Sequence, residues 1–118
     1  MTQRGDVVLV RIPYHQGTGA KKRPAVVVQC DRNNLRLQST IVAGITGKLT
    51  RVGTEPTQFL VDPGSLEGES SGLAFASAVK CENLFTVSQQ EIHHTLGRLS
   101  APLLLKLDDC LKVALELP

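Results

Sequence analysis

Residues 17–28 read Gly-Thr-Gly-Ala-Lys-Lys-Arg-Pro-Ala-Val-Val-Val, a turn followed by a strand. The glycines favour a loop, whereas the run that begins at Pro24 is too apolar and β-branched to be anything but a buried strand. Three consecutive cations, Lys21, Lys22 and Arg23, therefore lie where a loop meets the core. Such a junction either presents an arginine fork to a phosphate or carries an ordinary solvated charge cluster. The segment alone leaves both interpretations open.

The pattern on either side predicts a chain that is mostly β-structure. Apolar runs bounded by Gly, Pro, Asp or Asn predict strands at residues 7–12, 24–30, 39–45, 57–61, 73–75, 78–81 and 84–87, with a bend near 82–83 and a shorter strand within 92–99. The connecting segments are expected to be loops at 13–22 and 47–56, a turn or one helical turn at 31–34, and an exposed stretch at 64–72. We expect a mainly antiparallel curved sheet or small barrel.

A helix is expected at the C-terminal end. Ser100 is a good N-cap, and a leucine-rich stripe at helical spacing follows it. Asp108 and Lys112 are spaced to form an i,i+4 ion pair. Leu105 and Val113 widen the apolar sector, which fits either a second packing surface, such as another subunit, or a core helix covered on all sides.

Composition excludes several classes of protein. No apolar run among the 118 residues is long enough to span a membrane, and the N-terminus has no signal-peptide pattern. Three separated cysteines form no C-x-x-C, so we expect buried free thiols in a reducing cytoplasm rather than disulfides or a zinc site. The adjacent His93 and His94 would point to opposite faces of a strand and cannot chelate one ion. No metal or cofactor is expected.

The small net charge of +2 conceals a segregation along the chain. Residues 1–51 carry nine Lys/Arg and two acids, whereas residues 52–118 carry four Lys/Arg and nine acids. This asymmetry indicates a cationic face for a polyanion, unless the two halves neutralise each other on folding. With one Tyr, three Phe and no Trp, phosphate contacts should outweigh base stacking.

The cationic junction gains a partner if the second and third strands are neighbours. Antiparallel pairing would bring Arg23, at the start of one strand, to Thr46, at the end of the other. A guanidinium and a hydroxyl in one site suit phosphoryl transfer, and RNA supplies its own nucleophile, the 2′-hydroxyl. Alternatively, Thr46 is simply a β-branched residue that ends a strand.

Several short motifs together resemble the MazF/PemK family of toxin ribonucleases. They are Arg4-Gly5-Asp6-Val7, Gly17-Thr18, Arg23-Pro24-Ala25-Val26-Val27-Val28-Gln29, Ile41-Val42-Ala43-Gly44-Ile45-Thr46 and the C-terminal helix. The resemblance implies that residues 1–118 form a single toxin ribonuclease domain with an SH3-like small barrel, of the type that MazF, PemK and CcdB toxins share. It also implies a homodimer, a cognate antitoxin, and metal-independent cleavage of single-stranded RNA that leaves a 2′,3′-cyclic phosphate and a 5′-hydroxyl.

The resemblance also assigns roles to residues. Arg23 matches the catalytic arginine, which stabilises the transition state, and Thr46 matches the threonine that holds the scissile phosphate. Residues expected to bind RNA are Thr18, His15, Lys22, Lys48 and Asn83. The family's loop acid is absent, which leaves the general base unassigned, with His15 as a candidate.

Two further departures are that Phe85 replaces a frequent basic residue, which alters base reading, and that Gly44 stands where a larger residue or Pro is common. Alternative interpretations are a CcdB-like gyrase poison and a nucleic-acid-binding relative without turnover. The last residues, Ala-Leu-Glu-Leu-Pro, lack the bulky aromatic side chain that a gyrase poison favours.

Overall fold

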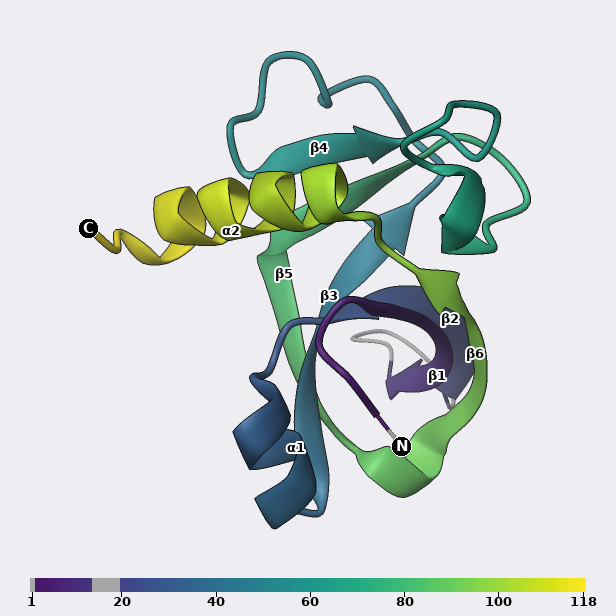
Figure 1. The fold of residues 1–118 in the computed structure, drawn as a ribbon, viewed down its shortest axis with the longest axis vertical. Coiled ribbons are helices and arrows are strands. Elements are labelled where there is room, and N and C mark those ends of the chain that lie inside the picture. The colour runs from purple at the N-terminus through teal and green to yellow at the C-terminus, as the bar shows by residue number, and fades with distance from the viewer. Residues whose placement is uncertain (1, 14–19) are drawn as a thin grey trace.

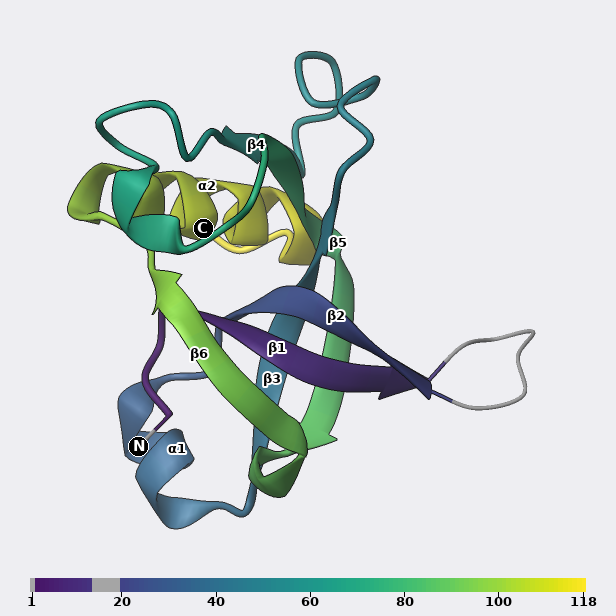
Figure 2. The same ribbon diagram turned by 90° about the vertical axis from the view of Figure 1, so that its right-hand side faces the viewer.

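The computed structural model describes residues 2–13 and 20–118. Six strands form one antiparallel sheet in the order β4-β5-β3-β2-β1-β6 (Figures 1 and 2). The elements are β1 (Asp6–Pro13), β2 (Ala20–Val27), α1 (Asp31–Arg36), β3 (Ser39–Thr46), β4 (Gln58–Val61), η1 (Glu69–Ser71), β5 (Ser77–Ser88), η2 (Gln89–Glu91), β6 (Ile92–Arg98) and α2 (Ala101–Leu115). The prediction of a mainly β fold with a C-terminal helix is confirmed, and the sheet curves strongly without closing into a complete barrel.

The largest differences from the predicted strands lie in β2 and before β5. β2 begins at Ala20 because Lys21 and Lys22 pair with Ile12 and Arg11 of β1, so the hairpin extends beyond the part of the sheet that β3 covers (Figure 2). Residues 73–75 form no strand, although their apolar character suggested one. Their neighbours 77–88 form one long strand, and an irregularity replaces the predicted bend.

The sheet separates two hydrophobic clusters. Helix α2 lies across β4 and β5 (Figure 1). It contributes Leu103 and Leu107 to one of the clusters, which also contains Val26 of β2 and Val79 of β5. The other cluster fills the concave side of the curved sheet; its members are Val8, Val10, Ile12, Ala25, Val27, Val42 and Val87. Alternation along each strand assigns successive residues to opposite clusters.

Gly5 and Asp6 explain the first motif structurally. Gly5 has φ +93°, and a Cβ at this position would lie 2.8 Å from Cδ2 of Leu104. Asp6 is buried, and its carboxylate accepts hydrogen bonds from the guanidinium of Arg98 at 3.0 Å and from the backbone N–H of Gln3 at 2.9 Å. The motif therefore fixes the start of β1 against β6 and α2.

Three details of the helix and the thiols differ from expectation. Ser100 occupies the N-cap, but its hydroxyl is buried without a partner in the described chain. Asp108 pairs with Arg4 at 2.8 Å and not with Lys112, because Arg4 reaches it from the start of β1. Cys30 is exposed at the N-cap of α1, contrary to the prediction that every thiol would be buried.

The prediction that residues 64–72 are exposed is also partly wrong. Ser71 and Gly68 are buried, because η1 packs against β6. A Cβ on Gly97 would lie only 2.3 Å from the carbonyl oxygen of Ser70, so glycine at this position permits the close approach of the two backbones. In residues 2–13 and 20–118, no helix is long and apolar enough to cross a membrane.

Candidate active site

Arg23 and Thr46 lie on the same face of the sheet, at the same end of the β2–β3 ladder. β2 and β3 pair in antiparallel fashion, as predicted, with Ala25 opposite Gly44 at the last rung. Arg23 precedes Ala25 by two residues and Thr46 follows Gly44 by two, so alternation directs both side chains to one face. Arg23 is exposed and Thr46 is half-buried. Solvent therefore reaches both groups at this end of the sheet.

The hydroxyl of Thr46 is oriented by the turn that follows β3. Thr46 Oγ1 accepts a hydrogen bond from the backbone N–H of Lys48 at 3.2 Å. The hydroxyl proton is then available to an external acceptor. Lys48 is exposed and makes no ion pair with any residue of the described ranges. A hydroxyl donor and an ammonium group thus come from positions 46 and 48, with only Gly47 between them.

A wide bulge in β5 delivers the next polar groups. Gly44 of β3 pairs with Lys80, but its neighbour Ala43 pairs with Leu84, so residues 81–83 have no partner in β3. Bulges of this kind redirect side chains and are common beside active sites. In this bulge Glu82 and Asn83 are exposed.

Gly44 makes room for Asn83. A Cβ on Gly44 would lie 3.5 Å from Asn83 Nδ2 and 3.6 Å from Cε2 of Phe85. The amide of Asn83 consequently lies over the backbone of β3, on the face that Arg23 and Thr46 share. The family that the sequence resembles often has a larger residue at position 44. In this chain the side chains of Asn83 and Phe85 occupy the space above Gly44 instead.

Glu82 is held by residues at the start of β4. Gln58 donates to one carboxylate oxygen at 2.7 Å and the hydroxyl of Thr57 donates to the other at 2.9 Å. Partial burial by itself would raise the pKa of Glu82, but these hydrogen bonds, together with the charge of Lys80, hold it below its usual value. The bulge therefore carries a fixed negative charge at neutral pH, next to the neutral amide of Asn83.

The remaining predicted site residues have different outcomes. Lys22 is exposed, but it alternates with Arg23 and pairs with Arg11, so its side chain leaves from the opposite face of β2. Thr18 and His15 lie outside the described residues. The structure thus places Arg23, Thr46 and Asn83 on one face of the sheet, puts Lys48 in the turn that follows β3, and separates Lys22 from them.

Sequence reasoning missed the surroundings of these residues. Phe75 was assigned to a strand, whereas its exposed ring lies against Gly47, next to Thr46. The only sequence feature that distinguishes Phe75 is its position among small residues, Ala74, Ala76 and Ser77. Within residues 2–13 and 20–118, no group of three or more His, Cys, Asp or Glu side chains is arranged to hold a metal ion.

The charge segregation is only partly neutralised by folding. Arg4 pairs with Asp108 and Arg11 with Glu91, so these cations from the first half of the chain meet acids from the second. Lys48 belongs to the same half and forms no ion pair with a residue of the described ranges. Guanidinium and hydroxyl donors on one open face, with an ammonium group in the adjoining turn, suit a phosphodiester, and the amide of Asn83 suits the edge of a base.

The chain is similar to known proteins over nearly its whole length. The family model described as the PemK-like, MazF-like toxin of type II toxin–antitoxin systems matches residues 3–115. The endoribonuclease MazF9 of Mycobacterium tuberculosis is 31% identical over 123 residues, which cover 99% of this chain and 98% of that protein.

Solved structures share the fold. An endoribonuclease in complex with its cognate antitoxin, from a mycobacterial species, superimposes with a TM-score of 0.76 at 22% identity and covers 100% of this chain and 98% of that one. A MazE–MazF structure from Deinococcus radiodurans gives a TM-score of 0.73 at 17% identity, with 99% of this chain and 98% of that one covered.

Proposed function

Because this chain belongs to the PemK-like, MazF-like toxins of type II toxin–antitoxin systems, we propose that it is an endoribonuclease that cleaves single-stranded RNA in a sequence-specific manner. Its curated relative MazF9 is named an endoribonuclease. The single observation that carries the proposal furthest is the placement of Arg23 and Thr46 on one open face at the end of the β2–β3 ladder. Cleavage of messenger RNA would inhibit translation and growth.

The proposed reaction uses the substrate's own nucleophile and requires no metal. The 2′-oxygen attacks the adjacent phosphorus and loses its proton, and the bond between phosphorus and the 5′-oxygen breaks. The departing 5′-oxygen takes up a proton, so the products are a 2′,3′-cyclic phosphate and a 5′-hydroxyl. Negative charge grows on the non-bridging oxygens during this step, so donors fixed in advance at that position lower the barrier.

Arg23 and Thr46 supply these donors in the proposal. The planar guanidinium of Arg23 donates two parallel hydrogen bonds to the phosphorane oxygens. The hydroxyl of Thr46, turned outward by the N–H of Lys48, donates to the scissile phosphate and positions it. Lys48 adds a positive charge beside it, and Asn83 reads a neighbouring base. The residue that accepts the 2′-proton stays a prediction, with His15 as the candidate.

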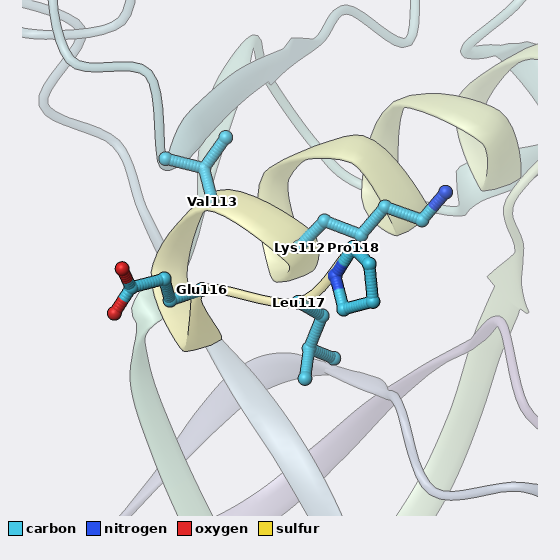
Figure 3. A pocket seen from close by; sticks show the side chains of 5 residues that line it. All are labelled: Lys112, Val113, Glu116, Leu117 and Pro118. Atoms are coloured by element: carbon cyan, nitrogen blue, oxygen red, sulfur yellow. The ribbon is translucent and has the colours of Figure 1, made fainter.

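We also propose two protein partners. A cognate antitoxin is expected because relatives of this fold have been solved with theirs. A second copy of the chain is expected on α2, where Leu105 and Val113 are more than half exposed. At the end of this helix, Lys112, Val113, Glu116, Leu117 and Pro118 line an open hollow of about 550 Å³ (Figure 3). Free thiols at all three cysteines fit a cytoplasmic location.

The test compares Arg23→Ala with a matched surface variant, Arg36→Ala. Arg36 is also exposed, but it lies on α1 and donates to Asn33. Wild-type protein and the Arg36→Ala control should cut single-stranded RNA in the presence of EDTA and leave cyclic phosphate and 5′-hydroxyl ends. Arg23→Ala should lower kcat by about 100- to 1,000-fold, the usual loss for one donor to a developing oxyanion. Equal rates for all three proteins would overturn the assignment of Arg23.

A further inference from the structure

Phe75 is an exposed aromatic side chain in the segment between η1 and β5. Of the phenylalanines, Phe59 is buried and Phe85 is half-buried, but 63% of Phe75 is exposed. Leaving such a ring in water forfeits the free energy that burial would provide. An exposed aromatic ring close to a binding site therefore suggests a ligand with an apolar face.

The ring is held in place by the turn after β3. A Cβ on Gly47 would lie 3.0 Å from Cε1, 3.7 Å from Cζ and 3.9 Å from Cδ1 of Phe75. One edge of the ring thus lies over Gly47, where the absence of a side chain leaves room for it. The hydroxyl of Ser77 donates to the carbonyl of Phe75 at 2.9 Å and fixes the backbone of the segment. The ring is consequently both exposed and positioned.

The position places Phe75 beside the phosphate-binding groups. Gly47, which the ring contacts, separates Thr46 from Lys48 in the chain, and Thr46 pairs with Ala78 of β5, three residues after Phe75. In single-stranded nucleic acids each phosphate is followed by an unstacked base, and proteins bind such bases on aromatic faces.

We propose that Phe75 stacks on a base of the bound RNA, immediately next to the phosphate that Thr46 holds. This inference rests on the proposed endoribonuclease function and adds a residue that positions the substrate. Every base has a π-face, so Phe75 contributes affinity and fixes the register of the strand. The amide of Asn83 and the charge of Glu82 then discriminate between bases at the edge.

Two assays test the proposal. The first measures the affinity for uncleavable 2′-O-methyl RNA hexamers that carry 2-aminopurine at each position in turn. The second measures cleavage of a long single-stranded RNA, with the 5′-hydroxyl ends mapped by sequencing. Binding should quench 2-aminopurine at one position. Phe75→Ala should remove that quenching and weaken binding roughly 5- to 150-fold, whereas Phe75→Trp should retain both properties.

Leu35→Ala is the matched control, because Leu35 is 67% exposed but lies on α1 at the far end of the sheet (Figure 1). This variant should behave as the wild type does. Unchanged affinity and quenching in Phe75→Ala, with normal cleavage, would overturn the stacking role alone. If the wild type quenches 2-aminopurine but does not cleave RNA, the proposed function is overturned, whereas the stacking of Phe75 on a base is supported.

The oligomeric state separates stacking from a protein–protein role. Sedimentation equilibrium should give the same mass for Phe75→Ala and the wild type, since the proposed occupant is a base. A lower mass for Phe75→Ala would place the ring in an interface between copies and overturn the proposal. An equal mass together with weaker RNA binding would support it.

Discussion

Replacing Thr46 by valine separates the chemistry of the site from its stability. Valine keeps the β-branched shape that suits the end of β3 and removes only the hydroxyl. That hydroxyl accepts one hydrogen bond, from the N–H of Lys48 at 3.2 Å, in an exposed turn. Water can replace this acceptor, so we expect the free energy of unfolding to change by less than about 0.5 kcal/mol.

The expected effect on catalysis is much larger. A hydrogen bond to a charged group contributes about 1.5–3 kcal/mol, and the scissile phosphate is such a group. Losing it should lower kcat/KM by about 10- to 150-fold. Thr46→Ser, which retains the hydroxyl, should recover most of the activity.

The assay is cleavage of a short single-stranded RNA with a fluorophore and a quencher at its ends, run beside urea unfolding of the same protein preparations. A Thr46→Val variant that cuts RNA at the wild-type rate would refute the assignment of the hydroxyl. Equal losses of activity in the valine and serine variants would attribute the effect to packing instead. Combining Thr46→Val with Arg23→Ala should give less than the sum of the two losses, because both groups act on one phosphate.

Three further predictions concern the rest of the chain. Burial and a neighbouring thiol raise the pKa of Cys81 to about 12, so iodoacetamide should modify Cys30 in the folded protein and Cys81 only after unfolding, as mass spectrometry would show. Gly72→Ala should destabilise the protein by more than about 2 kcal/mol in urea unfolding, because its φ is +75° and a Cβ would lie 2.0 Å from a backbone oxygen of β6, whereas a Cβ on Gly53 meets nothing within 4 Å. The pKa of Glu82 is lowered from 4.5 on folding, so its contribution to stability is present above pH 4.5 and lost below it; Glu82→Gln should lose less stability than the wild type between pH 6 and pH 3.

Local patterns were sufficient for most of the fold. β-branched runs bounded by turn residues located the strands, and the leucine stripe located α2, because these periods reflect which face of an element is buried. Lys21 and Lys22 were misassigned to a loop, because two consecutive charged residues after a glycine are typical of a loop. In the structure they extend the hairpin because their backbones pair with β1 and their side chains stay in water.

Part of the candidate site could also be predicted from local patterns. The placement of Arg23 and Thr46 at one end of the sheet was predicted because antiparallel pairing brings these two strand ends together. The contact of Phe75 with Gly47 depends on a loop conformation that no periodicity encodes. The separation of Lys22 from Arg23 depends on strand alternation, which applies only once residue 22 is known to lie in β2. The link between Asp108 and Arg4 joins residues 104 positions apart, and sequence spacing favoured Lys112 instead.

Because β1 pairs with β6, the sheet can be completed only after most of the chain has been synthesised. Asp6 and Arg98 are 92 positions apart, and the helix that Arg4 binds follows later still. A nascent chain on the ribosome holds β1 without this neighbour, and contacts between such distant residues form late. A polypeptide that terminates before residue 92 lacks both the sixth strand and the helix. The proposed cleavage of RNA therefore requires that the protein's own message be translated almost to the end.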